Sequence, residues 1–435
     1  MATATSRTTP PPPPELDPCA IRRWREEGGE LIDLLTRARA LGGVSTLRLG
    51  PTPTVLVTDP GAIQHVLAQH ADRYVKRSHR LRALLGDGVL SASGEPWKKQ
   101  RRFLQAHFTG QGIRRFERQM QDAARRTAER WAHAARTGQV RDIGEDLRFF
   151  SLDTIWRSLT GHQVDEDTYR QLQVTDTVFA ALPPFPPANA GPQPDLTAGL
   201  AEIDAVAAGA IAHARANPPG PDGPGLLHTL LAAAAEHPEY TERLIRDELV
   251  TLLVAGYETT ATTLSWLYLL LAEHPEQRAW ALAAGPAGSP ARAEAVRALI
   301  SETLRLYPAA WLMPRYATED DTLAGHRIEA GSSILTCPYL THRDPLLWPD
   351  PDHFRPRRFL GTDHRPTQPG AYYPFGIGPR ACLGMQFALR EMTVLLDHLL
   401  PAFTPAPRTT VPARAVFAIT VHPDGPIPAT ITTEP

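Results

Sequence analysis

One cysteine lies in surroundings that suit a metal-bound thiolate. Cys382 is in the segment 375–384 (FGIGPRACLG), between glycines and two residues after Arg380. Apolar residues recur at helical spacing over 385–400, so a helix is predicted to begin just after the cysteine. The free N–H groups and the dipole of that helix end, together with the arginine, favour a sulfur anion. A thiolate held in this way is a suitable axial ligand for haem iron.

A carboxylic acid and an alcohol are adjacent in the middle of a second predicted helix. Residues 242–272 have apolar side chains at helical spacing, and the centre of this stretch reads AGYETT. The small Ala255 and Gly256 would let a flat macrocycle and a diatomic ligand approach the backbone, and the glycine weakens the helix by about 1 kcal/mol. Cleavage of an O–O bond consumes protons, so Glu258 and Thr259 form a candidate proton relay.

These two segments resemble motifs of the cytochrome P450 family. The haem-binding loop of that family follows the pattern Phe-Gly-x-Gly-x-Arg-x-Cys-x-Gly, and a helix beside the haem follows Ala-Gly-x-[Asp/Glu]-Thr-Thr; every fixed position is filled here. The resemblance implies haem b with iron ligated by Cys382, use of O2, and Glu258 and Thr259 as the catalytic pair. The positions that it places against the cofactor in these motifs are Ala255, Gly256, Phe375, Arg380 and Gly384.

A third motif supplies groups that suit the propionates of a haem. Trp97 and Arg101 are one helical turn apart, so an indole N–H and a guanidinium lie on one helix face, where both can bind a carboxylate. The spacing is similar to the Trp-x-x-x-Arg motif of the resembled family. The resemblance adds Arg315 and Arg380 as further propionate contacts.

One acid and two arginines are expected to have a structural role. Glu302 and Arg305 lie at i and i+3 of a predicted helix, which alone is typical of a solvated surface pair. The segment 354–359 (FRPRRF) resembles the family's Phe-x-Pro-Glu-Arg-Phe. The resemblance implies a buried triad of Glu302, Arg305 and Arg358 that supports the haem loop. Arg357 stands where the family usually has glutamate, which leaves its local partner open.

The glycine-rich segment also matches a competing motif. Residues 376–381 fit the dinucleotide fingerprint G-x-G-x-x-A, and Asp397 lies 21 residues after Gly376. That fingerprint requires a buried strand before it and an acid at the end of a second strand. The preceding residues are AYYP, and Asp397 falls in a helical pattern, so the context disfavours a dinucleotide site. The sequence also lacks Gly-x-Ser-x-Gly and His-Glu-x-x-His motifs, which disfavours a serine hydrolase and a protein-bound zinc site.

Length and composition are typical of one large enzyme. The chain has 435 residues, 42% hydrophobic and 21% charged, and its net charge of −2 does not indicate nucleic acid or an anionic membrane as a partner. Residues 1–18, rich in Thr and Pro, are expected to be a disordered tail, and 19–435 a single catalytic domain. No long apolar run occurs and the three cysteines are far apart, so we expect no signal peptide, membrane anchor or disulfide framework, and a cytoplasmic protein.

Hydrophobic periodicity predicts a mainly α protein with small β-sheets, in agreement with the cytochrome P450 fold that the resemblance implies. Helices are predicted over 230–235, 242–272, 292–306 and 385–400. A β-hairpin is predicted over 44–59, strand-like runs over 322–335, and a C-terminal hairpin between 417–421 and 429–432. Residues 182–194, rich in proline, lie where the resembled family has a mobile substrate lid; a plain solvent loop is the alternative.

The resemblance implies a bacterial-type haem-thiolate monooxygenase that inserts one oxygen atom into a small molecule. Because no flavin or iron–sulfur module is present, the electrons would come from a separate ferredoxin and its NAD(P)H-dependent reductase. Lys98, Lys99 and Arg102 would form a basic patch that steers an acidic electron donor, with a solvated helix face as the alternative. A monomer is expected.

The expected substrate is lipophilic, such as a terpenoid or a polyketide-like or prenylated aromatic secondary metabolite. Two other functions remain open. The same haem could support oxidative coupling, cyclisation or atom transfer without net oxygenation. The chain could also be a non-catalytic haem protein, although Cys382 and the Glu258–Thr259 pair speak against this. The apolar positions predicted to line a substrate pocket are Leu84, Val89, Phe179, Phe185, Leu252, Trp311, Met313 and Phe417.

Overall fold

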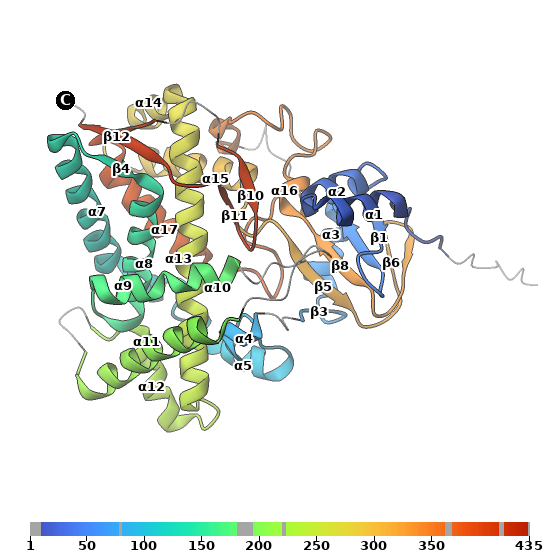
Figure 1. Cartoon of the computed structure of the whole chain (residues 1–435), viewed down its shortest axis with the longest axis horizontal. Coiled ribbons are helices and arrows are strands. Elements are labelled where there is room, and N and C mark those ends of the chain that lie inside the picture. Colours follow the sequence, from blue (N-terminus) through green and yellow to red (C-terminus); the bar gives the residue numbers. More distant parts are fainter. Residues whose placement is uncertain are drawn as a thin grey trace, which may run out of the picture.

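The structure, a computed structural model, describes residues 10–77, 81–180, 195–219, 223–361, 368–408 and 413–433, and helices form most of it (Figure 1). The α-helices are α1 (Pro18–Glu27), α2 (Leu31–Arg39), α3 (Pro60–Gln64), α4 (Arg82–Leu85), α5 (Gly94–Gln105), α6 (Gln111–Arg114), α7 (Glu117–Thr137), α8 (Ile143–Thr160), α9 (Glu166–Leu172), α10 (Val174–Ala180), α11 (Thr197–Ala216), α12 (Leu226–Glu236), α13 (Glu242–Glu273), α14 (Pro275–Ala283), α15 (Pro290–Leu306), α16 (Pro338–Thr341) and α17 (Met385–Leu399).

Short strands form the remaining regular structure. They are β1 (Val44–Leu47), β2 (Thr54–Val57), β3 (Tyr74–Val75), β4 (Val140–Asp142), β5 (Met313–Ala317), β6 (Asp321–Leu323), β7 (His326–Ile328), β8 (Ser333–Thr336), β9 (Phe403–Pro407), β10 (Ala415–Phe417), β11 (Val421–Pro423) and β12 (Pro428–Thr433). The predicted class, mainly α with small sheets, is confirmed.

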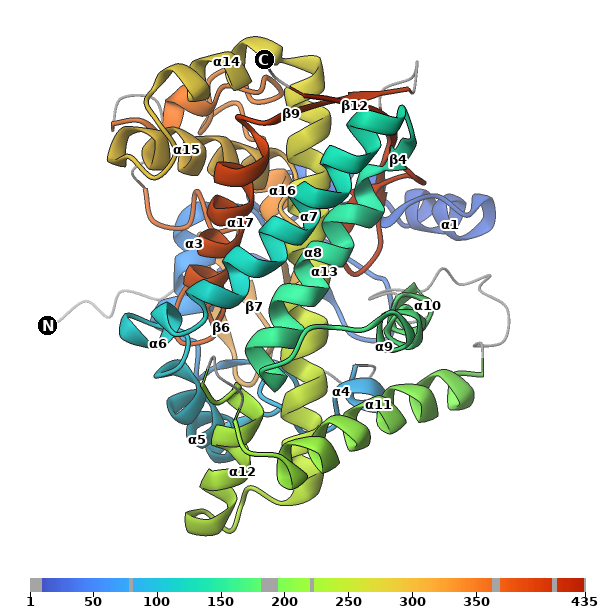
Figure 2. The ribbon, with the colours of Figure 1, turned by 90° about the vertical axis from the view of Figure 1, so that its left-hand side faces the viewer.

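The long helix α13 is the axis of the helical part. The Thr241 side chain caps it by accepting the backbone N–H of Leu244, and the helix contacts α8, α11, α15 and α17. Figure 2 shows α7 and α8 alongside α13. Side chains are buried around much of its circumference, as expected of a helix inside a large core. The helices predicted over 242–272, 292–306 and 385–400 are confirmed, and 230–235 lies within α12. None of the described helices combines the length and apolar character needed to cross a bilayer.

A five-stranded sheet in the order β1-β2-β8-β5-β3 forms the part of the molecule at the right of Figure 1. The predicted hairpin over 44–59 is confirmed, because β1 and β2 pair antiparallel with Val44 opposite Val57. β8 runs parallel to β2, and β5 runs antiparallel to β8. An apolar cluster that includes residues of α1 and α2 packs beneath this sheet. The sheet positions Met313 and Arg315, which both lie on β5.

Part of the predicted N-terminal tail is ordered. The Leu16 N–H donates to Thr46 O at 2.9 Å, and the Thr46 N–H donates to Pro14 O at 2.8 Å, so this segment runs beside β1. Leu16 packs into the apolar cluster beneath the sheet. Residues 14–16 of the expected tail therefore contact the fold in this structure, and composition alone does not reveal that β1 offers an edge to this segment. Residues 1–9 lie outside the described part.

The C-terminal strands pair differently from the prediction. β10 and β11 form the hairpin, with Phe417 opposite Val421 and the turn at 418–420. β12 pairs antiparallel with β9 and β4 instead. The Pro-Asp-Gly-Pro segment at 423–426, which indicated the hairpin turn, carries the chain from one small sheet to the next. The predicted pairing of 417–421 with 429–432 is therefore wrong.

Candidate functional site

The loop around Cys382 is folded tightly by its own backbone. The Cys382 N–H donates to Phe375 O at 2.7 Å, and Gly376 and Gly378 have φ angles of 69° and 74°. A Cβ at Gly378 would overlap the Leu67 carbonyl oxygen, so only glycine fits this close approach. Gly384 is the N-cap residue of α17. The residues before Gly376 form no strand, so the dinucleotide fingerprint is coincidental.

Cys382 is in the position expected of a ligand inside the molecule. Its side chain is accessible although protein atoms surround it densely, which is the combination that an interior cavity produces. Burial raises the pKa of this thiol, whereas the N–H groups of Gly384 and Met385 and the charge of Arg101 act in the opposite direction. A positive metal centre would complete the stabilisation of the thiolate, since metal binding displaces the thiol proton.

Three cations gather next to this loop without a neutralising partner in the described part of the chain. Lys76 Nζ, Arg315 Nη1 and Arg380 Nη2 each donate at 2.8 Å to backbone carbonyl oxygens, and the described residues place no carboxylate in an ion pair with them. Burial and the nearby arginines lower the pKa of Lys76 to about 7, and burial and the Arg380 charge lower that of Arg315 to about 10. A group with two carboxylates, such as a haem with its two propionates, would offset most of the charge of this cluster, so these residues fit that cofactor.

Sequence reasoning missed Lys76. The residue is one of only three lysines in the chain, which is the one signal that could have directed attention to it. Its role depends on β3 and β5 being neighbours, because this pairing places the segment after β3 beside Arg315. No local pattern predicts that pairing.

Helix α5 brings its two predicted propionate ligands to the same place. The Arg380 guanidinium carbon lies 4.2 Å from the centroid of the Trp97 ring, a cation–π contact across α5 and the cysteine loop. The buried Arg101 Nε has no hydrogen-bond partner among the described residues, and Arg101 is close enough to Cys382 for each to affect the other's pKa. The structure thus gathers Trp97, Arg101, Arg380 and Cys382, and their role as cofactor ligands stays a prediction.

The middle of α13 has an open face. Ala255 is exposed although Leu253 and Val254 before it are buried, so space adjoins the helix at this residue. Gly256 does not contribute to that space. A Cβ at Gly256 would lie 2.9 Å from Ile155 Cγ1 of α8, so this glycine permits close packing of two helices. The prediction that Gly256 lets the cofactor approach is therefore corrected, because its missing side chain is directed toward α8.

The acid of the predicted relay is held by two groups that the sequence did not reveal. Thr420 Oγ1 donates to Glu258 Oε1 at 3.1 Å, and Arg148 Nη1 lies 3.6 Å from Glu258 Oε2. The Thr259 hydroxyl donates to Ala255 O at 3.0 Å, which leaves its oxygen able to accept a hydrogen bond. Arg148 comes from α8 and Thr420 from the turn before β11, so only the tertiary fold brings them to Glu258.

Glu302, Arg305 and Arg358 form a buried charge cluster. Arg305 contacts Glu302 through two hydrogen bonds of 2.8 and 2.9 Å, and Arg358 Nε donates to Glu302 at 3.1 Å. Arg305 also donates to the carbonyl oxygens of residues 342, 351 and 353, so the cluster anchors that segment to α15. The arrangement is structural. Arg357, the departure from the family pattern, lies over the Trp280 ring at 5.1 Å.

Several predicted pocket residues are core residues. Trp311 is 1% exposed, donates its indole N–H to Ala418 O at 2.8 Å and lies in the cluster beneath the sheet. Phe417 is partly buried and packs against Trp311 and this cluster. Their assignment to a substrate pocket stays a prediction. Leu84 is fully buried in the helical core. Phe185 and the Phe179 side chain lie outside the described part.

The other three pocket candidates occupy positions nearer the site. Met313 Sδ lies 3.6 Å from the place of a Cβ on Gly376, so its side chain touches the cysteine loop. Leu252 is on α13, one turn before Ala255. Val89 contacts the first part of α13: its backbone N–H donates to the side-chain oxygen Glu248 Oε2 at 3.0 Å.

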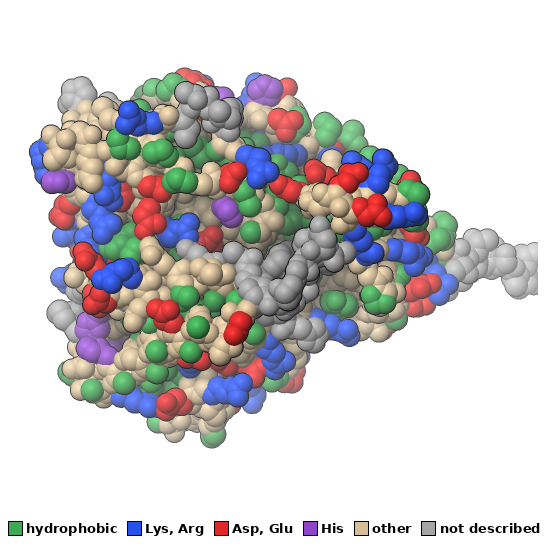
Figure 3. All heavy atoms as spheres, in the orientation of Figure 1, with side chains coloured by type: hydrophobic (Ala, Val, Ile, Leu, Met, Phe, Trp, Pro, Cys, Tyr) green, Lys and Arg blue, Asp and Glu red, His purple; other side chains and the backbone are tan. Residues whose placement is uncertain are grey.

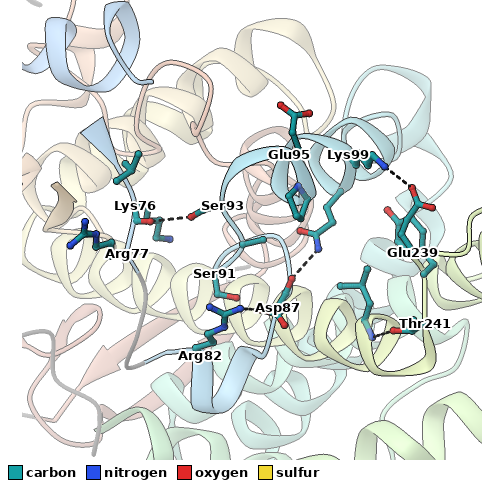
Figure 4. Close-up of a pocket in the computed structure, with 16 residues that line it drawn as sticks. Lys76, Arg77, Arg82, Asp87, Ser91, Ser93, Glu95, Lys99, Glu239 and Thr241 are labelled. Atoms are coloured by element: carbon teal, nitrogen blue, oxygen red, sulfur yellow. Dashed lines mark hydrogen bonds and ion pairs between the residues drawn. The ribbon is translucent and has the colours of Figure 1, made fainter. Parts of the chain in front are cut away.

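A cavity of about 880 Å³ opens beside Lys76 of the cation cluster (Figure 4). Lys76 and Arg77 lie at one end of it, and an ion pair of 3.6 Å between Lys99 and Glu239 lies at the other. Its described lining comes from residues 75–77 and 82–93, α5 and residues 239–244, and includes neither Cys382 nor Thr259. This cavity adjoins the cation cluster through Lys76, and its described lining does not include Ala255.

Comparisons with known proteins agree with these observations. The family description "Cytochrome P450" matches residues 10–280 and 291–425. Cyclooctatin synthase of Streptomyces melanosporofaciens is 30% identical over 91% of both chains, and cyclooctat-9-en-7-ol 5-monooxygenase of the same organism is 29% identical over 89% of this chain and 87% of its own.

Solved structures show the same architecture. The crystal structure of CYP175A1 from Thermus thermophilus is 28% identical and matches 96% of this chain and 100% of its own with a TM-score of 0.74. The cytochrome P450DA haem domain, at 23% identity, covers 98% of both chains with a TM-score of 0.84 and shares the fold. Cys382 lies at the start of a helix, and the described residues leave the cations beside it without counter-ions. Relatives match over nearly the whole length of the chain. The chain therefore belongs to the cytochrome P450 family and is a haem-thiolate monooxygenase.

Proposed function

We propose that this enzyme inserts one atom of O2 into a lipophilic secondary metabolite, such as a terpenoid or a polyketide-like or prenylated aromatic compound. The name of one relative specifies a monooxygenase that acts on cyclooctat-9-en-7-ol, which supports a substrate of this type. The observation that carries the proposal is the accessible Cys382 in the interior, flanked by buried cations that have no counter-ions among the described residues. We further propose a cytoplasmic monomer.

The residues around the cofactor have separate tasks in this proposal. Haem bound through Cys382 supplies iron-centred activation of O2. The propionates would be held by charge and hydrogen bonds from five side chains, those of Lys76, Trp97, Arg101, Arg315 and Arg380. These contacts would orient the cofactor and reduce the repulsion among the cations.

The acid–alcohol pair on α13 would deliver protons on the opposite side. Arg148 and Thr420 hold the Glu258 carboxylate, so this group exchanges protons from a fixed position. The Thr259 oxygen can accept a hydrogen bond while its own proton is directed at Ala255 O. The apolar Leu252 and Met313 would limit the access of water to the substrate.

We propose a separate ferredoxin, reduced by an NAD(P)H-dependent reductase, as the electron donor. The basic patch predicted for its docking is smaller than the sequence indicated. Lys98 pairs with Glu95 at 2.6 Å and Lys99 lies 3.6 Å from Glu239, whereas Arg102 is exposed. Exposed pairs of this kind are weak, so an acidic partner can compete for both lysines. Reduction rates that fall with added salt would support this arrangement.

The proposal is tested with the holoenzyme, a ferredoxin, its reductase and 18O2. Lipophilic compounds are first screened for a shift of the haem spectrum, and the products of those that bind are weighed. We expect a product heavier by one labelled oxygen atom. A product that has lost two hydrogen atoms without gaining oxygen would instead support oxidative coupling or cyclisation, and it would overturn the proposed insertion.

A further inference from the structure

Two histidines are paired near the end of α8, away from the haem site, and a third lies close to one of them. His162 follows α8, His213 lies in α11 and His228 lies in α12. α12 packs against both α8 and α11 (Figure 2), and histidine side chains gather on the surface over α11 and α12 at the left edge of Figure 3. The monooxygenase reaction assigns no task to these side chains.

The backbone at this junction is held in a fixed arrangement. Gly161 ends α8 with a φ of 83° and donates to Arg157 O at 2.8 Å. A side chain on Gly225, just before α12, would overlap Leu159 O, so the two segments are in direct backbone contact. The His162 N–H donates to Thr160 Oγ1 at 3.2 Å. These contacts fix the backbone from which the His162 and His228 side chains extend.

The His162 and His213 rings present the same nitrogen to each other. Their Nε2 atoms are 3.2 Å apart, and the rings are nearly perpendicular at 85°. A tetrahedral zinc ion with Zn–N bonds of about 2.0–2.1 Å places two ligand nitrogens about 3.3 Å apart. A hydrogen bond between two neutral imidazoles has a similar length, so this distance alone fits both a metal and a hydrogen bond.

His228 favours the metal. Neither of its ring nitrogens is accessible to solvent, and neither has a hydrogen-bond partner among the described residues. Buried polar atoms in folded proteins usually have a protein, water or ion partner. His228 is also close enough to His162 for the two rings to interact electrostatically. A hydrogen bond between His162 and His213 leaves both nitrogens of His228 unsatisfied, whereas a metal ion at this junction can use one of them.

We propose that His162 and His213 bind one divalent transition-metal ion that prefers imidazole, such as Zn²⁺, with His228 as a third ligand and water completing the site. As the side chains stand, no three metal-binding groups in the described part of the chain surround one point, so His228 must rotate to join the other two. The three ligands come from different segments, which is why no sequence motif indicated a zinc site. The bound ion would tie α11 to α8 and α12.

Zinc titration of the holoenzyme by calorimetry tests this proposal. The protein carries no affinity tag, and a chelator first removes loosely bound metal, while the haem iron keeps Cys382 occupied. We expect one Zn²⁺ per chain. His213→Gln retains a hydrogen-bonding partner for His162 but loses a metal ligand, and it should weaken Zn²⁺ binding at least about tenfold. His228→Ala should weaken binding as well, and His133→Ala, an exposed histidine on α7, should leave it unchanged.

Thermal unfolding supplies a second readout. Zn²⁺ should raise the unfolding midpoint of the wild type but not that of His213→Gln, because a ligand of the native state stabilises it by mass action. Equal zinc affinity in the wild type and His213→Gln would overturn the site, as would the absence of binding to the wild type. Unchanged affinity in His228→Ala would overturn its assignment as the third ligand. Carbon monoxide spectra that match the wild type show that each variant retains its haem site.

Discussion

Thr260 Oγ1 donates a 2.7 Å hydrogen bond to Glu391 Oε1, and both side chains are buried. Thr260 follows Thr259 in α13, and Glu391 lies nine residues after Cys382 in α17. Burial raises the pKa of Glu391 well above its usual value, which favours the neutral form of this carboxyl group. The contact joins the helix that carries Glu258 and Thr259 to the helix that follows Cys382.

Two substitutions at Glu391 should distinguish the contribution of its hydrogen bond to stability from the contribution of its packing. Glu391→Gln keeps an acceptor for Thr260 and is expected to unfold near the wild-type denaturant concentration. Glu391→Leu removes the acceptor and should lower the free energy of unfolding by about 1–3 kcal/mol. Urea unfolding of the holoenzyme measures both. An equal loss in the two variants would show that packing, and not the hydrogen bond, matters at this position.

Glu248 should make the stability of the enzyme depend on pH. Burial raises the pKa of this residue to about 8, and one of its oxygens accepts the Val89 N–H. Because the pKa is higher in the folded state than in the unfolded state, the stabilisation from the neutral acid is complete below about pH 4 and is lost as the pH rises toward 8.

Glu248→Gln cannot ionise but retains an acceptor for Val89. Its stability relative to the wild type should therefore rise between about pH 4 and pH 8, by at most about 5 kcal/mol, and then remain constant. Unfolding midpoints across this range provide the measurement. A stability difference that does not change with pH would mean that Glu248 is ionised in the folded protein.

The buried cluster of Glu302, Arg305 and Arg358 should make a large contribution to the free energy of unfolding, because it anchors the segment before the haem loop. Glu302→Ala leaves Arg305 and Arg358 as buried charges without a counter-ion, which should cost about 3–5 kcal/mol and reduce haem incorporation. Arg355→Ala is the matched control, because its exposed side chain pairs with Asp350 while only its backbone N–H contacts Glu302. Equal losses in both variants, measured by chemical unfolding, would contradict a special role for the buried acid.

Thr259→Ala should uncouple the reduction of O2 from product formation. Without the hydroxyl, the predicted relay lacks one of its two proton-carrying groups, and the ratio of hydrogen peroxide to product should rise at least about tenfold relative to the wild type. Thr259→Ser keeps the hydroxyl and should retain most of the coupling. The ratio of product to NAD(P)H consumed measures the effect, and a wild-type ratio in Thr259→Ala would show that protons travel by another route.

Features set by local spacing could be predicted from the sequence, and features set by distant contacts could not. Helical periodicity alone places Trp97 and Arg101 on one face of α5, and the glycines around Cys382 indicate its tight loop. The position of Lys76 beside Arg315 depends on the pairing of β3 with β5. The partners of Glu258 come from α8 and a turn far along the chain.

The corrected predictions have the same origin. The direction of the missing side chain of Gly256 depends on how α13 rotates against α8, which its motif does not specify. The contact of residues 14–16 with the fold depends on their hydrogen bonds to β1. The pairing of β12 depends on β4 and β9, which come from distant parts of the chain. In each case the decisive partner is not a neighbour in sequence.

The ferrous–carbon monoxide difference spectrum tests the central claim most directly. It should be recorded for the wild type, for Cys382→Ala and for Cys337→Ala, whose buried cysteine lies elsewhere in the core. We predict a strongly red-shifted Soret band in the wild type and in Cys337→Ala, and its loss in Cys382→Ala. Folded wild-type protein that binds no haem, or a band typical of a neutral axial ligand, would contradict haem-thiolate ligation by Cys382.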